Sequence, residues 1–278
     1  MIYLVLAVAS SAMVSIVMRL SEGRTRGQLS MLVFNYIMCL CLAGLYTGSN
    51  SLLPTTHGLG LAAGLGAFNG LLYLLGFILL QINVRKNGVV LSATFMKLGL
   101  LVPMAVSVGL FGEIPSVPQT VGFLLAVAAI ILINFEKGQN ATGFKLGLIL
   151  MLLAGGGGDA MSKIFEEFGN PALSEQFLFF TFACAGVLCF SLMVYRKERP
   201  GMSDLFFGLL IGIPNYFSSR FLLKALGSLS AVIVYPTYSV ATIVTVTLAG
   251  LLFFREKLGK RQLIAVGIIL AALILLNI

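Results

Sequence analysis

Residues 254–277, FREKLGKRQLIAVGIILAALILLN, repeat residues 111–134, FGEIPSVPQTVGFLLAVAAIILIN, at a shift of 143 positions. The identical pairs are Phe111 and Phe254, Glu113 and Glu256, Gln119 and Gln262, Ala128 and Ala271, Ala129 and Ala272, Ile131 and Ile274, Leu132 and Leu275, and Asn134 and Asn277. Further pairs are Tyr73 and Tyr216 at the same shift, and Arg19 with Lys163 and Glu22 with Glu166 at a shift of 144. A repeat of this extent indicates that the chain consists of two related halves.

The composition indicates that both halves lie in a membrane. The chain is 59% hydrophobic and 10% charged, and its mean hydropathy is +1.03. A soluble domain of this size cannot bury so much apolar surface, whereas a helix of about 20 mostly apolar residues crosses a bilayer. Ten such segments occur, at residues 2–18, 29–48, 60–81, 88–111, 117–135, 144–166, 173–195, 203–226, 229–254 and 261–277. The sequence therefore predicts an all-α membrane protein with ten transmembrane helices.

The number of spans in each half determines the relation between the halves. Residues 1–135 and residues 144–278 hold five spans each, and residues 136–143 link them. Because five is odd, the second half enters the membrane from the opposite side. Inverted repeats of this kind are typical of secondary transporters, whose binding site lies near the bilayer midplane between the repeats.

The net charge of +8 is concentrated in alternate loops. Of the eighteen Lys and Arg residues, fourteen follow odd-numbered spans: Arg19, Arg24, Arg26, Arg85, Lys86, Lys137, Lys145, Arg196, Lys197, Arg199, Arg255, Lys257, Lys260 and Arg261. Positive loops face the cytoplasm, so both termini are predicted to lie outside. We expect an integral protein of the cell membrane, the inner membrane of a bacterium, and the basicity requires no nucleic-acid partner.

No motif indicates an enzyme or a bound cofactor. Walker A, GxGxxG and HExxH patterns do not occur, and the cysteines form no metal-ligand set with the single histidine, His57. No paired carboxylates, Ser–His set or Cys–His set converges at one depth of the membrane. We therefore expect no metal and no cofactor, and transport driven by gradients of ions, such as protons, or of the substrate itself.

Lys97 is the first candidate site residue, because it lies in the middle of the otherwise apolar span 88–111. A charge at the centre of a membrane helix costs about 2.5–3.5 kcal/mol on insertion scales. Such a residue is retained where it meets a counter-ion, a water-filled cavity or a ligand. Lys97 is a structural partner of Asp159, an anion site for a carboxylate or phosphate, or a proton carrier. The first two roles are compatible.

Asp159 follows the run Gly155-Gly156-Gly157-Gly158 in the sixth span. Two interpretations of the glycines remain open. They allow close packing with a neighbouring helix, or they form an unwound segment whose peptide dipoles face a cavity. Asp159 is also four residues from Lys163, so these two side chains can pair along one helix face.

The eighth and ninth spans carry further polar residues in a helical pattern. Asn215, Tyr216, Arg220 and Lys224 follow Pro214 in the eighth span, and Tyr235, Tyr238, Thr242 and Thr245 share one face of the ninth. Arg220 points to the cavity or the interface, and Lys224 is expected to reach toward head groups. The face on the ninth span lines a cavity or holds helices together by hydrogen bonds. Asn69 and Tyr73 in span three would form the symmetry-related wall.

The end of the chain resembles the EamA-like transporters of the drug/metabolite transporter superfamily. The resemblance rests on Phe253-Phe254-Arg255-Glu256-Lys257-Leu258, Gln262 and Leu276-Asn277, with a weaker copy at Phe111-Gly112-Glu113 and Gln119. It implies a basket of helices around a central cavity, lined by spans one to four and six to nine and braced by spans five and ten. Small multidrug-resistance relatives carry a glutamate in the first span, where this chain has Ser10, Ser11 and Ser15. The family also implies termini inside, whereas the charge count predicts them outside.

Together these features predict a secondary transporter that moves a small polar metabolite by alternating access. Four basic groups in or near the spans (Lys97, Lys163, Arg220 and Lys224) stand against one deep acid, Asp159, and so favour an anionic or zwitterionic substrate. The alternatives are a translocator of lipids or lipid-linked substrates, an exporter of cationic or amphipathic compounds, and a channel. The expected partners are the substrate and membrane lipids, and the protein is expected to be a monomer or homodimer.

Overall fold

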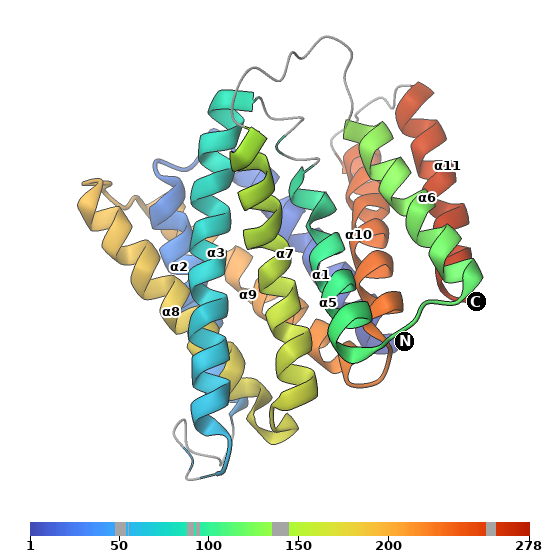
Figure 1. Ribbon diagram of the computed structural model, residues 1–278. Coiled ribbons are helices and arrows are strands. Elements are labelled where there is room, and N and C mark those ends of the chain that lie inside the picture. Colours follow the sequence, from blue (N-terminus) through green and yellow to red (C-terminus); the bar gives the residue numbers. More distant parts are fainter. Residues whose placement is uncertain (48–53, 55, 88–91, 93–94, 135–144, 254–259) are drawn as a thin grey trace. The chain divides into compact units, whose positions relative to one another are not determined.

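The computed structural model describes residues 1–278 except 48–53, 55, 88–91, 93–94, 135–144 and 254–259. The described residues form helices and no strands (Figure 1). The α-helices are α1 (Ile2–Ser21), α2 (Gln28–Tyr46), α3 (Leu59–Asn87), α5 (Leu101–Phe111), α6 (Val117–Asn134), α7 (Lys145–Phe168), α8 (Ser174–Tyr195), α9 (Met202–Leu226), α10 (Ala231–Phe253) and α11 (Lys260–Leu276). Two short 3₁₀ helices, η1 (Leu98–Leu100) and η2 (Pro171–Leu173), precede α5 and α8. The all-α prediction is confirmed.

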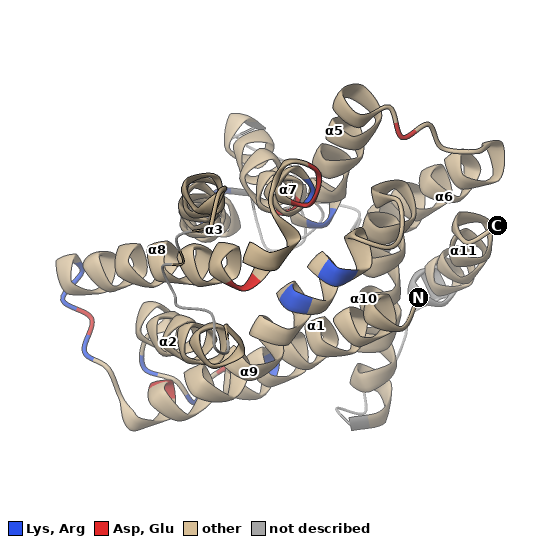
Figure 2. Ribbon diagram, turned by 90° about the horizontal axis from the view of Figure 1, so that it is seen from below, with Lys and Arg blue, Asp and Glu red and all other residues tan. Residues whose placement is uncertain are grey.

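Seven of these helical segments are long and apolar enough to cross a bilayer. They are Ile2–Ser21, Gln28–Tyr46, Leu59–Lys86, Leu146–Phe168, Pro171–Tyr195, Met202–Leu226 and Ala231–Leu252. The other three predicted spans hold shorter apolar helices within the described residues, at Phe95–Phe111, Val117–Leu132 and Ile264–Leu276. Figure 2 shows mostly uncharged helices, with charged residues largely near helix ends and in loops. Residues 254–259, which carry the acidic loop of the second repeat, lie outside the described residues.

The chain divides into two compact units. Unit 1 comprises Met1–Leu74 and Ile164–Gly227, and unit 2 comprises Leu75–Lys163 and Ser228–Ile278. Each unit combines segments from both predicted halves, and the helices α3 and α7 each contribute to both units. The units are thus a different division of the chain from residues 1–135 and 144–278. The inverted repeat and the central cavity stay predictions.

Unit 1 is held together by close approach of helix backbones. Helix α9 packs against α1 and α2, and α2 packs against α8. A Cβ at Gly208 would lie 2.5 Å from the main-chain oxygen of Met31, and one at Gly212 would lie 2.5 Å from Cβ of Met38. Helices in lipid associate through such small residues, because lipid tails are as apolar as the side chains and give no hydrophobic driving force.

The start of α2 is capped by a carboxylate from a distant segment. Its own N-cap residue, Gly27, has no side chain to accept the unpaired N–H groups of the first turn. Asp204 in the first turn of α9 accepts the N–H of Arg26 at 2.7 Å and the hydroxyl of Ser30 at 2.7 Å. Glu198 accepts the N–H of Ser30 at 2.8 Å. These bonds join the start of α2 and the residue Arg26 before it to Asp204 at the start of α9 and to Glu198 in the preceding loop.

In unit 2, α6 and α11 lie side by side, and α10 packs against α5, α6 and α11 (Figure 1). Helix α7 is α-helical through Gly155–Gly158, so the unwound alternative is wrong. A Cβ at Gly156 would overlap the main-chain oxygen of Gly99 and lie 2.8 Å from Cβ of Val102. The packing interpretation of this glycine is therefore confirmed. Gly99 belongs to η1, which directly follows Lys97, so this contact positions the segment that carries Lys97.

Candidate functional site

A pocket of about 460 Å³ lies within unit 1. Its walls come from the ends of α2, α7 and α9, from η2 and from the start of α8. The lining residues are Tyr46, Phe165, Glu166, Pro171, Ala172, Ser174, Glu175, Leu178, Arg220, Leu223, Lys224 and Gly227. Two acids and two bases therefore line a cavity whose remaining walls are mainly apolar and aromatic. Small-molecule sites in proteins have volumes of about 300–1,000 Å³ and this mixed character.

The sequence Asn170-Pro171-Ala172-Leu173-Ser174-Glu175 explains how Glu175 reaches the pocket. The side chain of Asn170 accepts the N–H of Ala172 at 3.0 Å, and the hydroxyl of Ser174 donates to the main-chain oxygen of Pro171 at 2.7 Å. These local bonds form η2 and lead directly into α8. Glu175 consequently lies in the first turn of α8, where the positive end of the helix dipole favours a carboxylate.

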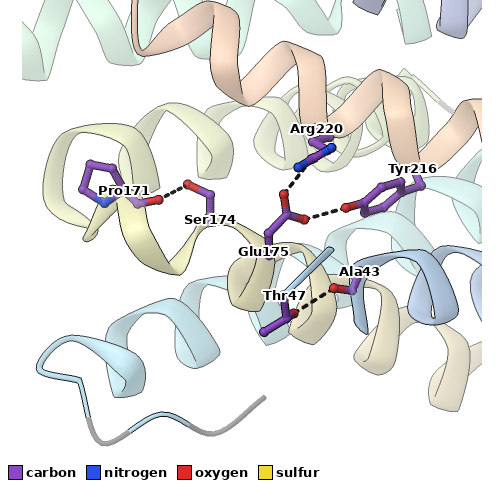
Figure 3. A network of polar contacts seen from close by, with 7 residues as sticks. All are labelled: Ala43, Thr47, Pro171, Ser174, Glu175, Tyr216 and Arg220. Carbon is purple, nitrogen blue, oxygen red and sulfur yellow. Dashed lines mark hydrogen bonds and ion pairs between the residues drawn. The ribbon is translucent and has the colours of Figure 1, made fainter. Parts of the chain in front are cut away.

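Glu175 binds two side chains of α9 with its two carboxylate oxygens (Figure 3). Arg220 Nε donates to Oε1 at 2.6 Å, and the hydroxyl of Tyr216 donates to Oε2 at 2.5 Å. The side chains of Arg220 and Glu175 are 17% and 16% exposed, so this ion pair is partly buried but reachable from the pocket. Tyr216 and Arg220 are one helical turn apart, which is why one carboxylate can bind both.

Aromatic rings hold the two bases of the pocket. Arg220 Cζ lies 3.9 Å from the centre of the Tyr46 ring, and Tyr46 stacks on Tyr216 with ring centres 5.8 Å apart. Lys224 Nζ lies 5.4 Å from the centre of the Tyr3 ring. Each ring face attracts the cation above it and helps to orient the base. Arg220 offers a planar fork that matches a carboxylate or phosphate of a ligand.

Unit 2 contains a second polar cluster, formed by Lys97, Asp159 and Tyr235. The charges of Lys97 and Asp159 lie close enough to interact, as one interpretation of the sequence required. The hydroxyl of Tyr235 donates to the main-chain oxygen of Asp159 at 2.6 Å. These three residues come from three separate predicted spans.

The sequence analysis missed two acids. Lys163, predicted to pair with Asp159 along α7, forms an ion pair with Glu113 at 2.8 Å, with side-chain exposures of 3% and 17%. Glu113 also accepts the N–H of Val232 at 3.3 Å, at the start of α10. The sequence analysis counted four bases against one deep acid, Asp159. That count is wrong, because Glu113 pairs with Lys163 and Glu175 pairs with Arg220. Glu113 is one of the identical residues of the internal repeat, and this repetition could have marked it as a candidate. No sequence pattern marked Glu175.

The remaining predicted site residues do not line the pocket of unit 1. Asn215 donates to Asn35 Oδ1 at 3.1 Å and to Cys39 Sγ at 3.7 Å, and so joins α9 to α2. Asn69 Oδ1 and Thr242 Oγ1 are buried, and neither atom has a hydrogen-bond partner in the described part of the chain. Tyr73 and Tyr238 are half-buried on α3 and α10. In that same part of the chain, no group of three or more His, Cys, Asp or Glu side chains is placed to hold a metal ion.

The apolar helices define an integral membrane protein. Residues 141–278 match the EamA-like transporter family, as the resemblance at the end of the chain predicted. An uncharacterised protein of Haemophilus influenzae is 27% identical over 210 residues, which are 73% of this chain and 72% of that protein. A protein of known crystal structure has the same fold, with a TM-score of 0.73, 15% identity, and coverage of 99% of this chain and 94% of its own.

Proposed function

We propose that this protein is a secondary active transporter of a small metabolite that carries a carboxylate, and that the unit 1 pocket binds it. The observation that carries the proposal is the ion pair of Arg220 and Glu175 in the wall of this pocket. A guanidinium that already binds one carboxylate, and that faces a cavity, has the geometry to bind a second. The cycle is alternating access, driven by a gradient.

The charges of the pocket favour a zwitterion or a monocarboxylate over a polyanion. Glu166 and Glu175 balance Arg220 and Lys224 in formal charge. The sequence favoured an anionic substrate because it showed more basic than acidic groups in the spans. The structure gives less support for an anion, because Lys163 and Arg220 have acidic partners. The apolar lining, which includes Phe165, Leu178 and Leu223, favours a substrate with an apolar side chain.

The charge distribution of the loops supports an orientation for this site. The pocket is lined by the segment between α7 and α8 and by the end of α9. Both segments follow even-numbered predicted spans, whose loops carry few basic residues. We propose a bacterial inner membrane, odd-numbered loops in the cytoplasm, and a pocket on the outer side.

The test compares three probes of similar shape by thermal unfolding of the purified full-length chain. Leucine carries a carboxylate and an ammonium, 4-methylpentanoate lacks the ammonium, and 3-methylbutylamine lacks the carboxylate. We expect the two carboxylates to stabilise the protein and the amine to have no effect, since a ligand at 100 times its Kd adds about 2.7 kcal/mol. The double variant Glu175→Gln/Arg220→Gln removes both charges together and should lose the response.

Lys97→Gln serves as the control that separates the two polar clusters. We expect this variant to bind leucine as the wild type does, but to transport it more slowly in proteoliposomes, because Lys97 belongs to the cluster in unit 2. Stabilisation by 3-methylbutylamine alone would indicate a cation exporter. A response to phospholipids and to none of the three probes would indicate a lipid translocator.

The lipid alternative has one observation in its favour. An apolar groove of about 290 Å³ lies in unit 2 between α5 and α6, lined by Leu101, Met104, Ala105, Val108, Pro115, Thr120 and Phe123. A groove of this lining can hold an acyl chain. It lacks basic side chains that would bind a head group, so the unit 1 pocket remains the better candidate for a substrate site.

A further inference from the structure

Glu175 and a bound carboxylate require the same partner. In the structure, Arg220 Nε donates to Glu175 Oε1 at 2.6 Å, and this ion pair forms part of the pocket wall. A ligand carboxylate that enters the pocket is attracted to the Arg220 guanidinium, whose donors form a fork suited to planar oxyanions. It therefore either displaces Glu175 from Arg220 or shares the guanidinium with it.

The charge balance changes in both cases. The two acids and two bases that line the pocket sum to zero formal charge. A ligand with a single carboxylate brings this sum to −1 and places two carboxylates beside one guanidinium. In a partly buried site, a nearby like charge disfavours the ionised form of a carboxyl group. The occupied pocket is thus one positive charge short.

We propose that Glu175 takes up one proton when a ligand carboxylate binds to Arg220, so that the ligand and a proton are carried together. The inference rests on the function proposed above and names its coupling ion. The proton comes from the protonated buffer through the solvent and forms an O–H bond at Oε1, while the Arg220 hydrogen bond passes to the ligand. The Tyr216 hydroxyl continues to donate to Oε2, which becomes the carbonyl oxygen of the neutral acid.

The groups around Glu175 determine which acid receives the proton. Tyr216, Arg220 and Lys224 face the pocket region from α9, Tyr46 faces it from the end of α2, and Glu166 faces it from the end of α7. Glu166 is the competing acceptor, because it is the other acid of the lining. Glu175 is favoured, since it is the carboxylate that Arg220 Nε binds and therefore the one that a ligand leaves without its counter-ion.

A zwitterion provides an internal control. Its ammonium brings the missing positive charge and can bind the carboxylate that Arg220 releases. Leucine should therefore bind without proton uptake, whereas 4-methylpentanoate should bind with one proton. The two probes share a side chain and a carboxylate, so the difference isolates the ammonium.

The experiment is isothermal titration calorimetry of the purified full-length chain in buffers of different ionisation enthalpy, near pH 7. The slope of the binding enthalpy against the buffer enthalpy counts protons. We expect about one proton per 4-methylpentanoate, about none per leucine, and an affinity for 4-methylpentanoate that rises about tenfold per unit decrease in pH. Glu175→Gln, which mimics the neutral acid, should bind 4-methylpentanoate without proton uptake or pH dependence. Glu167→Gln, which changes an exposed acid of α7 outside the pocket lining, should keep both.

The outcomes separate this inference from the proposed function. Binding of both probes without proton uptake would overturn the proton coupling and leave the substrate site intact. Proton uptake that persists in Glu175→Gln would overturn the assignment to Glu175. If neither probe binds, the pocket is not a carboxylate site and both proposals fail.

Discussion

Two neighbouring glycines of α7 are predicted to respond oppositely to the same substitution. A Cβ at Gly156 would overlap the main-chain oxygen of Gly99 and lie 2.8 Å from Cβ of Val102. A Cβ at Gly155 would find no atom within 4 Å outside its own helix. We therefore expect Gly156→Ala to destabilise unit 2, and Gly155→Ala to stabilise it.

The magnitudes follow from these contacts. Carbon atoms pack at about 3.5–4.0 Å, so α7 and the η1 segment must separate by about 1 Å to admit a methyl group at Gly156. Overpacking of this kind costs about 1–3 kcal/mol, and the helix preference of alanine over glycine returns up to about 1 kcal/mol. The net loss is about 1–2 kcal/mol for Gly156→Ala. For Gly155→Ala the helix preference acts alone and adds up to about 1 kcal/mol.

Thermal unfolding in detergent measures both variants. A thiol-reactive fluorescent dye reports the transition, because Cys39 and Cys189 are buried in the folded protein. With about 2–4 °C per kcal/mol for a chain of this size, we expect Gly156→Ala to lower Tm by about 2–8 °C and Gly155→Ala to raise it by up to about 4 °C. If both variants shift Tm in the same direction, the close approach at Gly156 is not what holds η1 against α7.

Three further predictions concern the polar contacts. Asp204→Ala should lower the free energy of unfolding by about 3 kcal/mol, because the N–H groups of Arg26 and Gly201 and the hydroxyl of Ser30 lose their acceptor. Ser30→Ala removes one donor and should cost about 1 kcal/mol. Dye-monitored unfolding compares the two variants, and equal losses would contradict the role of Asp204 as an acceptor for main-chain N–H groups. Glu113→Gln should cost about 3 kcal/mol, because the buried Lys163 loses the carboxylate that binds it at 2.8 Å. The double variant Glu113→Gln/Lys163→Met should recover most of that loss in the same assay. Tyr46→Leu should weaken binding of 4-methylpentanoate by about 2–5-fold, because Arg220 loses the ring that orients it. Tyr46→Phe keeps a ring and should bind this probe with the wild-type affinity, as measured by calorimetry.

Much of the fold was predictable because lipid permits few alternatives. A main chain that crosses a bilayer must satisfy its own hydrogen bonds, so a run of about 20 apolar residues indicates a helix directly. Seven predicted spans correspond to helices long enough to cross, and three to shorter apolar helices. The apolar segments and the internal repeat were enough to indicate the EamA-like family from the sequence alone. Lys97 and Asp159 interact, as one interpretation of the sequence expected, since polar residues in apolar spans tend to pair.

The pairing of charges was decided only by the tertiary structure. Spacing along a helix identifies side chains three or four residues apart that can contact each other. On this basis the sequence suggested that Lys163 pairs with Asp159. In the structure Lys163 forms an ion pair with Glu113, and Arg220 forms one with Glu175, which is 45 residues away. Both acids stand near helix ends, where a charge in the sequence is most simply explained by exposure to water. Their roles depend on which helix ends pack together, and long-range packing leaves no periodic signal in one sequence. The apolar pattern determined which segments enter the membrane, whereas packing determined that Arg220 meets Glu175 and Tyr46 at the wall of a pocket.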